Sequence, residues 1–94
     1  MIVEWSVPAK DDLIAIADYI ATDDPVAALD VMDRIDGAVG RLADHPGSGR
    51  PGRISGTREL AIPNLHYIVA YRIRRERVQI LRVLHAARRW PGRA

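Results

Sequence analysis

Residues 13–44, LIAIADYIATDDPVAALDVMDRIDGAVGRLAD, hold two amphipathic patterns separated by one short break. The first pattern has the i, i+3, i+4, i+7 spacing of one helix face and comprises Leu13, Ile16, Ala17 and Ile20. The second follows the same period and comprises Ala28, Met32, Ile35, Val39 and Leu42. In the break, Asp24 can cap free amides while Pro25 is tolerated in a first helical turn. Two helices joined by so short a turn are predicted to form an antiparallel hairpin.

A short β-prone segment, IVEWS at 2–6, precedes the first helix. We expect Ser6 to cap this helix, with Pro8 in its first turn. The first helix is predicted to end near Ala21 and the second near Asp44, before a His-Pro-Gly stop signal.

Residues 45–58 are rich in glycine, proline and arginine, which predicts a loop without a regular element. Three strands are predicted after it, at 58–62, 66–74 and 77–84, where Val, Ile, Leu and Tyr dominate. Their short links require antiparallel pairing. The predicted fold class is α/β (α+β): an N-terminal strand, an antiparallel helical hairpin, then a three-stranded antiparallel meander forming a small curved sheet.

The composition limits what the chain can be. It has 94 residues, 48% of them hydrophobic, which predicts a single domain over 1–94. It has no cysteine, which excludes disulfides, zinc-thiolate sites, iron-sulfur clusters and a cysteine nucleophile, and we expect no cofactor and no metal. No apolar run reaches the roughly 18 residues of a membrane span, and MIVEWSVPAKDD does not resemble a signal peptide. We therefore expect a cytoplasmic protein without membrane contact.

Charge is distributed unevenly along the chain. Residues 1–47 carry ten acidic and three basic side chains, a balance of −7, whereas residues 48–94 carry two acidic and eleven basic ones, a balance of +9. Thirteen of the fourteen cations are arginine, whose planar fork suits phosphate and carboxylate. The arginines therefore indicate an anionic partner, although a solvated face or pairing with the acidic half explains them equally well.

The glycine-rich loop lacks GxxxxGK[ST] and is not a P-loop, but Arg50, Arg53 and Arg58 could contact a partner's anions from it.

Metal-free RNA hydrolysis needs a base, an acid and cations at the phosphate. The candidates for these roles are His85, Glu59, Arg82 and Arg88. Arg82 and His85 are three residues apart, so a regular strand directs them to opposite faces unless it ends or bulges there. The structural alternatives are a satisfied histidine at a strand end and an arginine paired with the acidic helices.

Aromatic residues favour packing over ligand binding. Tyr67 and Tyr71 are predicted on one strand face, and Tyr19 lies beside the first helical stripe. Five aromatic residues and no Phe do not make a base-stacking surface, and Trp5 and Trp90 are expected to anchor the chain ends.

The order of elements and four strings resemble the RelE/ParE superfamily of toxins from bacterial type II toxin-antitoxin modules. The strings are WSVPAKDDLIAIADYIATDDPVAA, HPGSGRPGRISGTRELAIP, YIVAYRI and VQILRVLHAARRW. The resemblance implies a helical hairpin against an antiparallel sheet and a cognate antitoxin, hence a toxin-antitoxin hetero-oligomer. We expect a partner-binding surface that includes Arg50, Arg53, Arg58, Arg82, Arg88, Arg89 and Trp90.

The superfamily has two activities. RelE-like members cut messenger RNA on the ribosome and often have an arginine directly after the residue that opens the third strand, where this chain has Ile68. ParE-like members tend to be apolar there and act on DNA gyrase. The resemblance to YIVAYRI and ILRVLHAARRW favours the ParE branch, an interaction protein without its own chemistry. The alternative is a RelE-like endoribonuclease that uses His85, Arg82 and Arg88, with Glu59 or Arg58.

Overall fold

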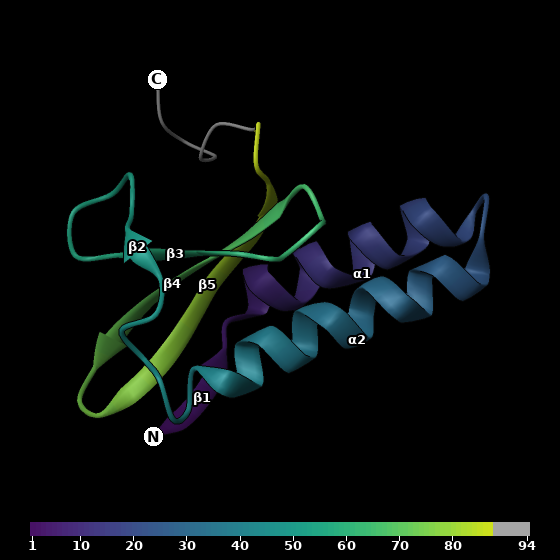
Figure 1. Cartoon of the computed structure of the whole chain (residues 1–94). Coiled ribbons are helices and arrows are strands. Elements are labelled where there is room, and N and C mark those ends of the chain that lie inside the picture. Colours follow the sequence, from purple (N-terminus) through teal and green to yellow (C-terminus); the bar gives the residue numbers. More distant parts are fainter. Residues whose placement is uncertain (88–94) are drawn as a thin grey trace.

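The computed structural model describes residues 1–87 and has seven regular elements in them. In chain order they are β1 (Ile2–Trp5), α1 (Val7–Ala21), α2 (Pro25–Arg41), β2 (Arg50–Pro51), β3 (Arg58–Ala61), β4 (Tyr67–Arg74) and β5 (Arg77–His85). The predicted α+β fold class is confirmed, with the two helices side by side against the sheet (Figure 1). No helix in the described part of the chain is long and apolar enough to span a membrane.

Both helices begin at the predicted capping residues. The Ser6 hydroxyl accepts a hydrogen bond from the Ala9 amide at 3.1 Å, and the Asp24 carboxylate accepts one from the Ala27 amide at 3.0 Å. The second helix ends at Arg41, three residues earlier than predicted. The Asp44 amide bonds the carbonyl three residues back, so the chain tightens into a turn there.

The sheet has five strands in the order β1-β5-β4-β3-β2. The antiparallel meander β3-β4-β5 is confirmed, and β1 adds to it in parallel beside β5 (Figure 1). The loop prediction for 45–58 needs a correction, because Arg50 and Pro51 pair with β3 as a two-residue strand. Pro51 is compatible with this position because β2 is an edge strand, where a missing amide costs little.

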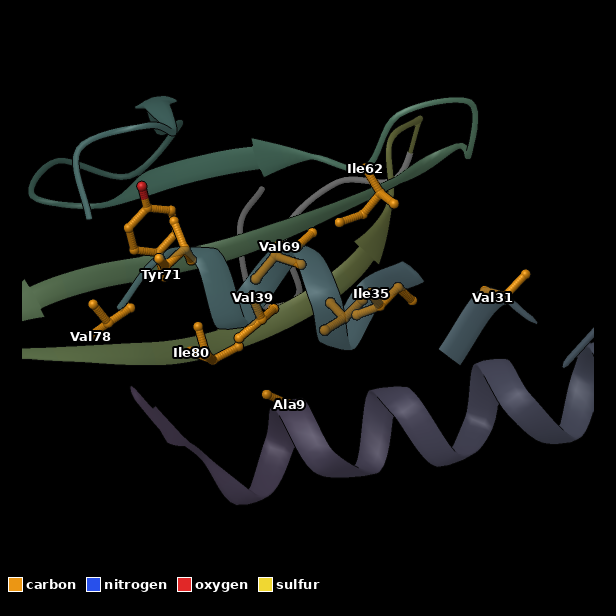
Figure 2. Close-up of a cluster of buried hydrophobic side chains, with 12 residues drawn as sticks. Ala9, Val31, Ile35, Val39, Ile62, Val69, Tyr71, Val78 and Ile80 are labelled. Atoms are coloured by element: carbon orange, nitrogen blue, oxygen red, sulfur yellow. The ribbon is translucent and has the colours of Figure 1, made fainter. Parts of the chain in front are cut away.

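The core lies between the helices and one face of the sheet (Figure 2). Helix α2 contributes fully buried side chains such as Ile35 and Val39, which pack toward Val69 and Ile80 of the sheet. In α1 only Ala9 is buried, and the predicted stripe residues are half-buried. A second, smaller cluster lies on the opposite face of the sheet and comprises Ile68, Ala70 and Leu84, with Ile54 and Leu81 against them.

A β-bulge interrupts the pairing of β4 and β5. Ala70 pairs with Arg82, whereas the next residue, Tyr71, pairs with Ile80, so Leu81 is the additional residue. The alternation of faces therefore shifts by one after Ile80. Arg82 therefore does not share a face with Ile80, and it lies opposite Ala70 on the sheet face away from the helices.

Candidate functional site

A groove of about 540 Å³ opens between α1 and the last residues of β5. It is lined by Asp12, Ala15, Ile16, Tyr19, Tyr67, Val83, Leu84 and His85. The groove exists because β1 pairs with β5 only as far as Ile80. Beyond that point no strand within residues 1–87 lies along the outer edge of β5, and α1 lies beside it instead.

Asp12 is the central polar contact of the groove. Its carboxylate accepts two hydrogen bonds from the Arg82 guanidinium, from Nε at 2.7 Å and from Nη2 at 2.8 Å. It also accepts the backbone amide of Val83 at 2.9 Å. These hydrogen bonds, with a smaller Coulombic contribution from Asp12, raise the pKa of Arg82 above its ordinary value, against the opposing effect of desolvation. The charge of Arg82 is therefore compensated within the protein, as the structural alternative for this residue predicted.

His85 lies at the rim of the groove. It pairs with Tyr67 across the sheet, on the helix side, and the two rings meet edge to face with centroids 5.7 Å apart. The ring of His66 lies 6.0 Å from that of His85. The imidazole is exposed, and its Nδ1 accepts the Ala87 amide at 3.3 Å, which leaves Nε2 to carry the proton in the neutral form. Within residues 1–87 no hydrogen bond or ion pair joins His85 to Arg82.

Glu59 holds the loop after β2 against the sheet. Its side chain is almost fully buried and faces Arg50 at 3.5 Å and Arg53 Nε at 3.3 Å. The backbone amide of Arg53 donates to the same carboxylate at 2.9 Å, and its guanidinium donates to the Ala86 carbonyl at 3.2 Å. Two of the three predicted loop arginines thus meet at Glu59, a shared partner that spacing alone did not indicate.

Arg58, the third loop arginine, stabilises the preceding turn. It donates to the Gly49 carbonyl at 2.8 Å and to the Gly47 carbonyl at 3.4 Å. The buried Tyr71 hydroxyl donates to the Pro46 carbonyl at 2.7 Å and accepts the Gly49 amide at 2.8 Å. The packing interpretation of Tyr71 is confirmed.

Two further predictions concern single side chains. Ile68 stands at the position where RelE-like members often have an arginine. Its side chain has no hydrogen-bond donor and is buried in the outer cluster. Tyr19 is 79% exposed, and the expectation that it packs in the core is wrong. It lies on the flank of α1 that faces the groove.

Arg88, Arg89 and Trp90 lie outside the described residues. Within residues 1–87 no three His, Asp or Glu side chains are placed to hold a metal ion. The residue that sequence reasoning missed is Asp12, whose partner Arg82 is 70 positions away. In the sequence, Asp12 is distinguished only by its place four positions before Ile16, on the flank of an apolar stripe. That position does not indicate which residue it contacts.

The chain resembles known proteins along most of its length. The family profile described as the ParE toxin of the type II toxin-antitoxin system parDE matches residues 3–90. The "Putative toxin Y4kP" of Sinorhizobium fredii is 49% identical over 89 residues, which cover 95% of this chain and 92% of that relative. Toxin RelE2 of Caulobacter vibrioides is 35% identical over 86 residues, covering 92% and 96%.

Solved structures agree with this assignment. A chain of the chromosomal ParDE TA system from P. aeruginosa has a TM-score of 0.81 and 31% identity, with 90% of this chain and 95% of that chain covered. A chain of the toxin-antitoxin complex RelBE2 from Mycobacterium tuberculosis has a TM-score of 0.59 and 29% identity, with 89% and 95% covered. Since the family profile spans nearly the whole chain and the fold follows that of a ParDE structure, this chain belongs to the ParE toxin family of type II toxin-antitoxin systems.

Proposed function

We propose that this ParE-family toxin arrests growth by interfering with DNA gyrase and that a cognate antitoxin neutralises it. The match to the ParE profile supports the first part, and the similarity to chains solved as toxin-antitoxin systems supports the second. In this proposal the toxin acts by binding and carries out no chemical step of its own.

The observation that carries the choice of a binding function is the Asp12–Arg82 pair. A metal-free nuclease needs uncompensated cations around the scissile phosphate. Here the Arg82 guanidinium is engaged by a carboxylate through two short hydrogen bonds, and that carboxylate also lines the groove in which His85 stands. Because its charge is already compensated, Arg82 offers no free cation to a phosphate here, so the groove favours a protein partner over an RNA strand.

The antitoxin is proposed to cover the basic surface with carboxylates and an apolar stripe. Arg50 is well exposed and Arg58 is only partly so, and the internal contacts of each use fewer donors than its guanidinium has. Arg53 remains a proposed member of the same surface. Arg82, Arg88, Arg89 and Trp90 remain proposed members of this partner-binding surface. Charge complementarity would guide the encounter, while apolar anchors would supply most of the affinity.

Expression in bacterial cells tests the proposal. Induction of the toxin alone should arrest growth, and co-expression of the small acidic protein encoded beside it should restore growth. Plasmid DNA from arrested cells should have lost negative supercoils or carry trapped breaks, while messenger RNA stays intact at ribosomal A-site codons. Normal growth at verified expression would refute the toxin function, and arrest with unchanged plasmid topology would refute the gyrase target.

A second candidate function is ribosome-dependent RNA cleavage. The 35% identity to a relative named Toxin RelE2 is the observation that favours it. In that case His85, Arg82 and Arg88, with Glu59 or Arg58, would form the site. His85→Ala should then slow A-site cleavage by about a hundredfold or more, the usual effect of losing an acid-base group. Arg34→Ala, on α2 and outside the lining of this groove, is the matched control and should leave cleavage unchanged.

A further inference from the structure

The turn between β4 and β5 carries a dense positive charge that the proposed function does not use. Four arginines occur within six residues, and Glu76 is the one acid among them. This segment, Arg72–Arg77, is called the arginine tip below. It lies at the opposite end of the β4–β5 ribbon from the groove, because Tyr67 and His85 pair at one end and Arg74 and Arg77 at the other (Figure 1).

The fold leaves much of this charge uncompensated. Arg72 donates to the Gln79 side chain at 2.6 Å, and Arg77 meets Glu4 at 3.2 Å in an exposed ion pair. In the part of the chain that the structure describes, Arg74 and Arg75 make no side-chain hydrogen bond or ion pair. Both are exposed, so their guanidinium groups are available to a ligand.

The geometry of the tip is unfavourable in the free protein. Arg74 and Arg77 are directly paired across the two strands, on the sheet face away from the helices, and like charges at such positions destabilise a sheet. The two turn residues, Arg75 and Glu76, have φ angles of 53° and 60°, a conformation that favours glycine or asparagine. A bound anion between the paired arginines would relieve the repulsion.

We propose that the arginine tip binds the phosphate backbone of duplex DNA. A two-stranded β-ribbon fits the major groove of a duplex, and arginine forks match phosphate oxygens. Single-stranded RNA is usually held by stacked aromatic side chains, and residues 72–79 contain none. A stable protein interface needs apolar anchors, and within the tip only Ile73 is apolar, at 40% exposure. This inference goes beyond the proposed function, because it requires neither gyrase nor antitoxin.

Fluorescence anisotropy with the purified full-length chain and a short labelled DNA duplex of arbitrary sequence tests the proposal. If each of the four arginines of the tip contacts one phosphate, the logarithm of the association constant should fall with the logarithm of the salt concentration at a slope of about −3.6. This slope corresponds to about a hundredfold weaker binding at 200 mM than at 50 mM salt. The double variant Arg74→Ala/Arg75→Ala should reduce the magnitude of that slope by about 1.8.

The matched control is Arg34→Ala/Arg41→Ala on α2, which removes the same charge from exposed positions elsewhere. We expect this control to keep the wild-type slope. An equal loss in both double variants would mean that binding follows net charge, and it would overturn the proposal. Binding of single-stranded RNA as tightly as the duplex, or no binding to duplex DNA at low salt, would overturn it as well. Because the assay contains no gyrase, these outcomes are independent of the gyrase target.

Discussion

At the scale of single residues, the Asp12 side chain makes a hydrogen bond at the edge of β5 that a neighbouring strand would otherwise make. Beyond Ile80 no strand within residues 1–87 pairs with the outer edge of β5, and an unpaired amide at a sheet edge invites pairing with other chains. The Asp12 carboxylate accepts the Val83 amide at this edge and holds Arg82 with its two oxygens. One side chain from α1 thus closes the edge and fixes the helix against the sheet.

Replacing Asp12 by asparagine should therefore destabilise the protein. The amide side chain of Asp12→Asn keeps one acceptor but loses the charge that the Arg82 guanidinium needs, and hydrogen bonds to charged groups contribute about 1.5–3 kcal/mol. We expect a fall in Tm of roughly 10 °C, measured by circular dichroism. The neighbouring exposed Asp11→Asn is the control, and its Tm should stay near the wild-type value. Equal Tm values for the two variants would contradict this role of Asp12.

The raised pKa of Arg82 gives this contribution a defined pH dependence. A group whose pKa is higher in the folded state stabilises fully below its unfolded pKa and loses that effect only as the pH rises through the folded value. The guanidinium therefore stays charged at every neutral or moderately alkaline pH. We expect the Tm difference between wild type and Asp12→Asn to be constant from pH 7 to about pH 10, the range below the ordinary pKa of arginine. A difference that shrinks across that range would contradict the assignment.

Gly49 is a second residue whose replacement should lower stability, because its surroundings leave no room for a Cβ atom. A Cβ added there would lie 2.6 Å from the Tyr71 hydroxyl oxygen, which bonds the Pro46 carbonyl and the Gly49 amide. Gly49→Ala should lower the free energy of unfolding by about 1–3 kcal/mol, the usual effect of overpacking, as measured by urea unfolding. Gly47→Ala is the matched control, since nothing lies within 4 Å of its added Cβ. A loss of similar size in both variants would show that general loop rigidity, and not this contact, is responsible.

At the scale of elements, the β4–β5 turn should gain stability when its residues are made to suit its backbone. Arg75→Asn/Glu76→Gly places the preferred pair of a type I′ turn at two left-handed positions. Each left-handed residue costs roughly 1–2 kcal/mol, so Tm should rise by several degrees in thermal unfolding. Gly56→Ala tests the same backbone effect in the opposite direction and should lower Tm. Gly56 has a φ of 82°, which disfavours alanine, and nothing lies within 4 Å of the added Cβ to cause a clash. A lower Tm for the double variant would contradict the strain at the arginine tip.

The elements with local signals were predictable from the sequence. Ser6 and Asp24 cap the helices through hydrogen bonds that span three residues, and the meander follows from strands with short links. Contacts across long sequence separations were not predictable. The Asp12–Arg82 pair spans 70 residues, the parallel pairing of β1 with β5 depends on the packed hairpin, and the Leu81 bulge leaves no local mark.

At the scale of the whole molecule, the uneven charge predicts that the rate of association between the toxin and the proposed antitoxin depends on salt. The second half of the chain carries +9, and an acidic partner would be attracted to it before contact. The association rate should fall by about tenfold or more between low and high salt, while the dissociation rate changes less, as measured by stopped-flow mixing. Rates that do not depend on ionic strength would contradict electrostatic steering.

The gyrase target is tested most directly with purified components. Toxin added to gyrase, relaxed plasmid and ATP should block supercoiling or trap cleaved DNA, and added antitoxin should reverse the effect. His85→Ala should inhibit as well as the wild type, because the proposed toxin acts without acid-base chemistry. Supercoiling at the normal rate with excess toxin, together with A-site cleavage of messenger RNA that His85→Ala abolishes, would contradict the account.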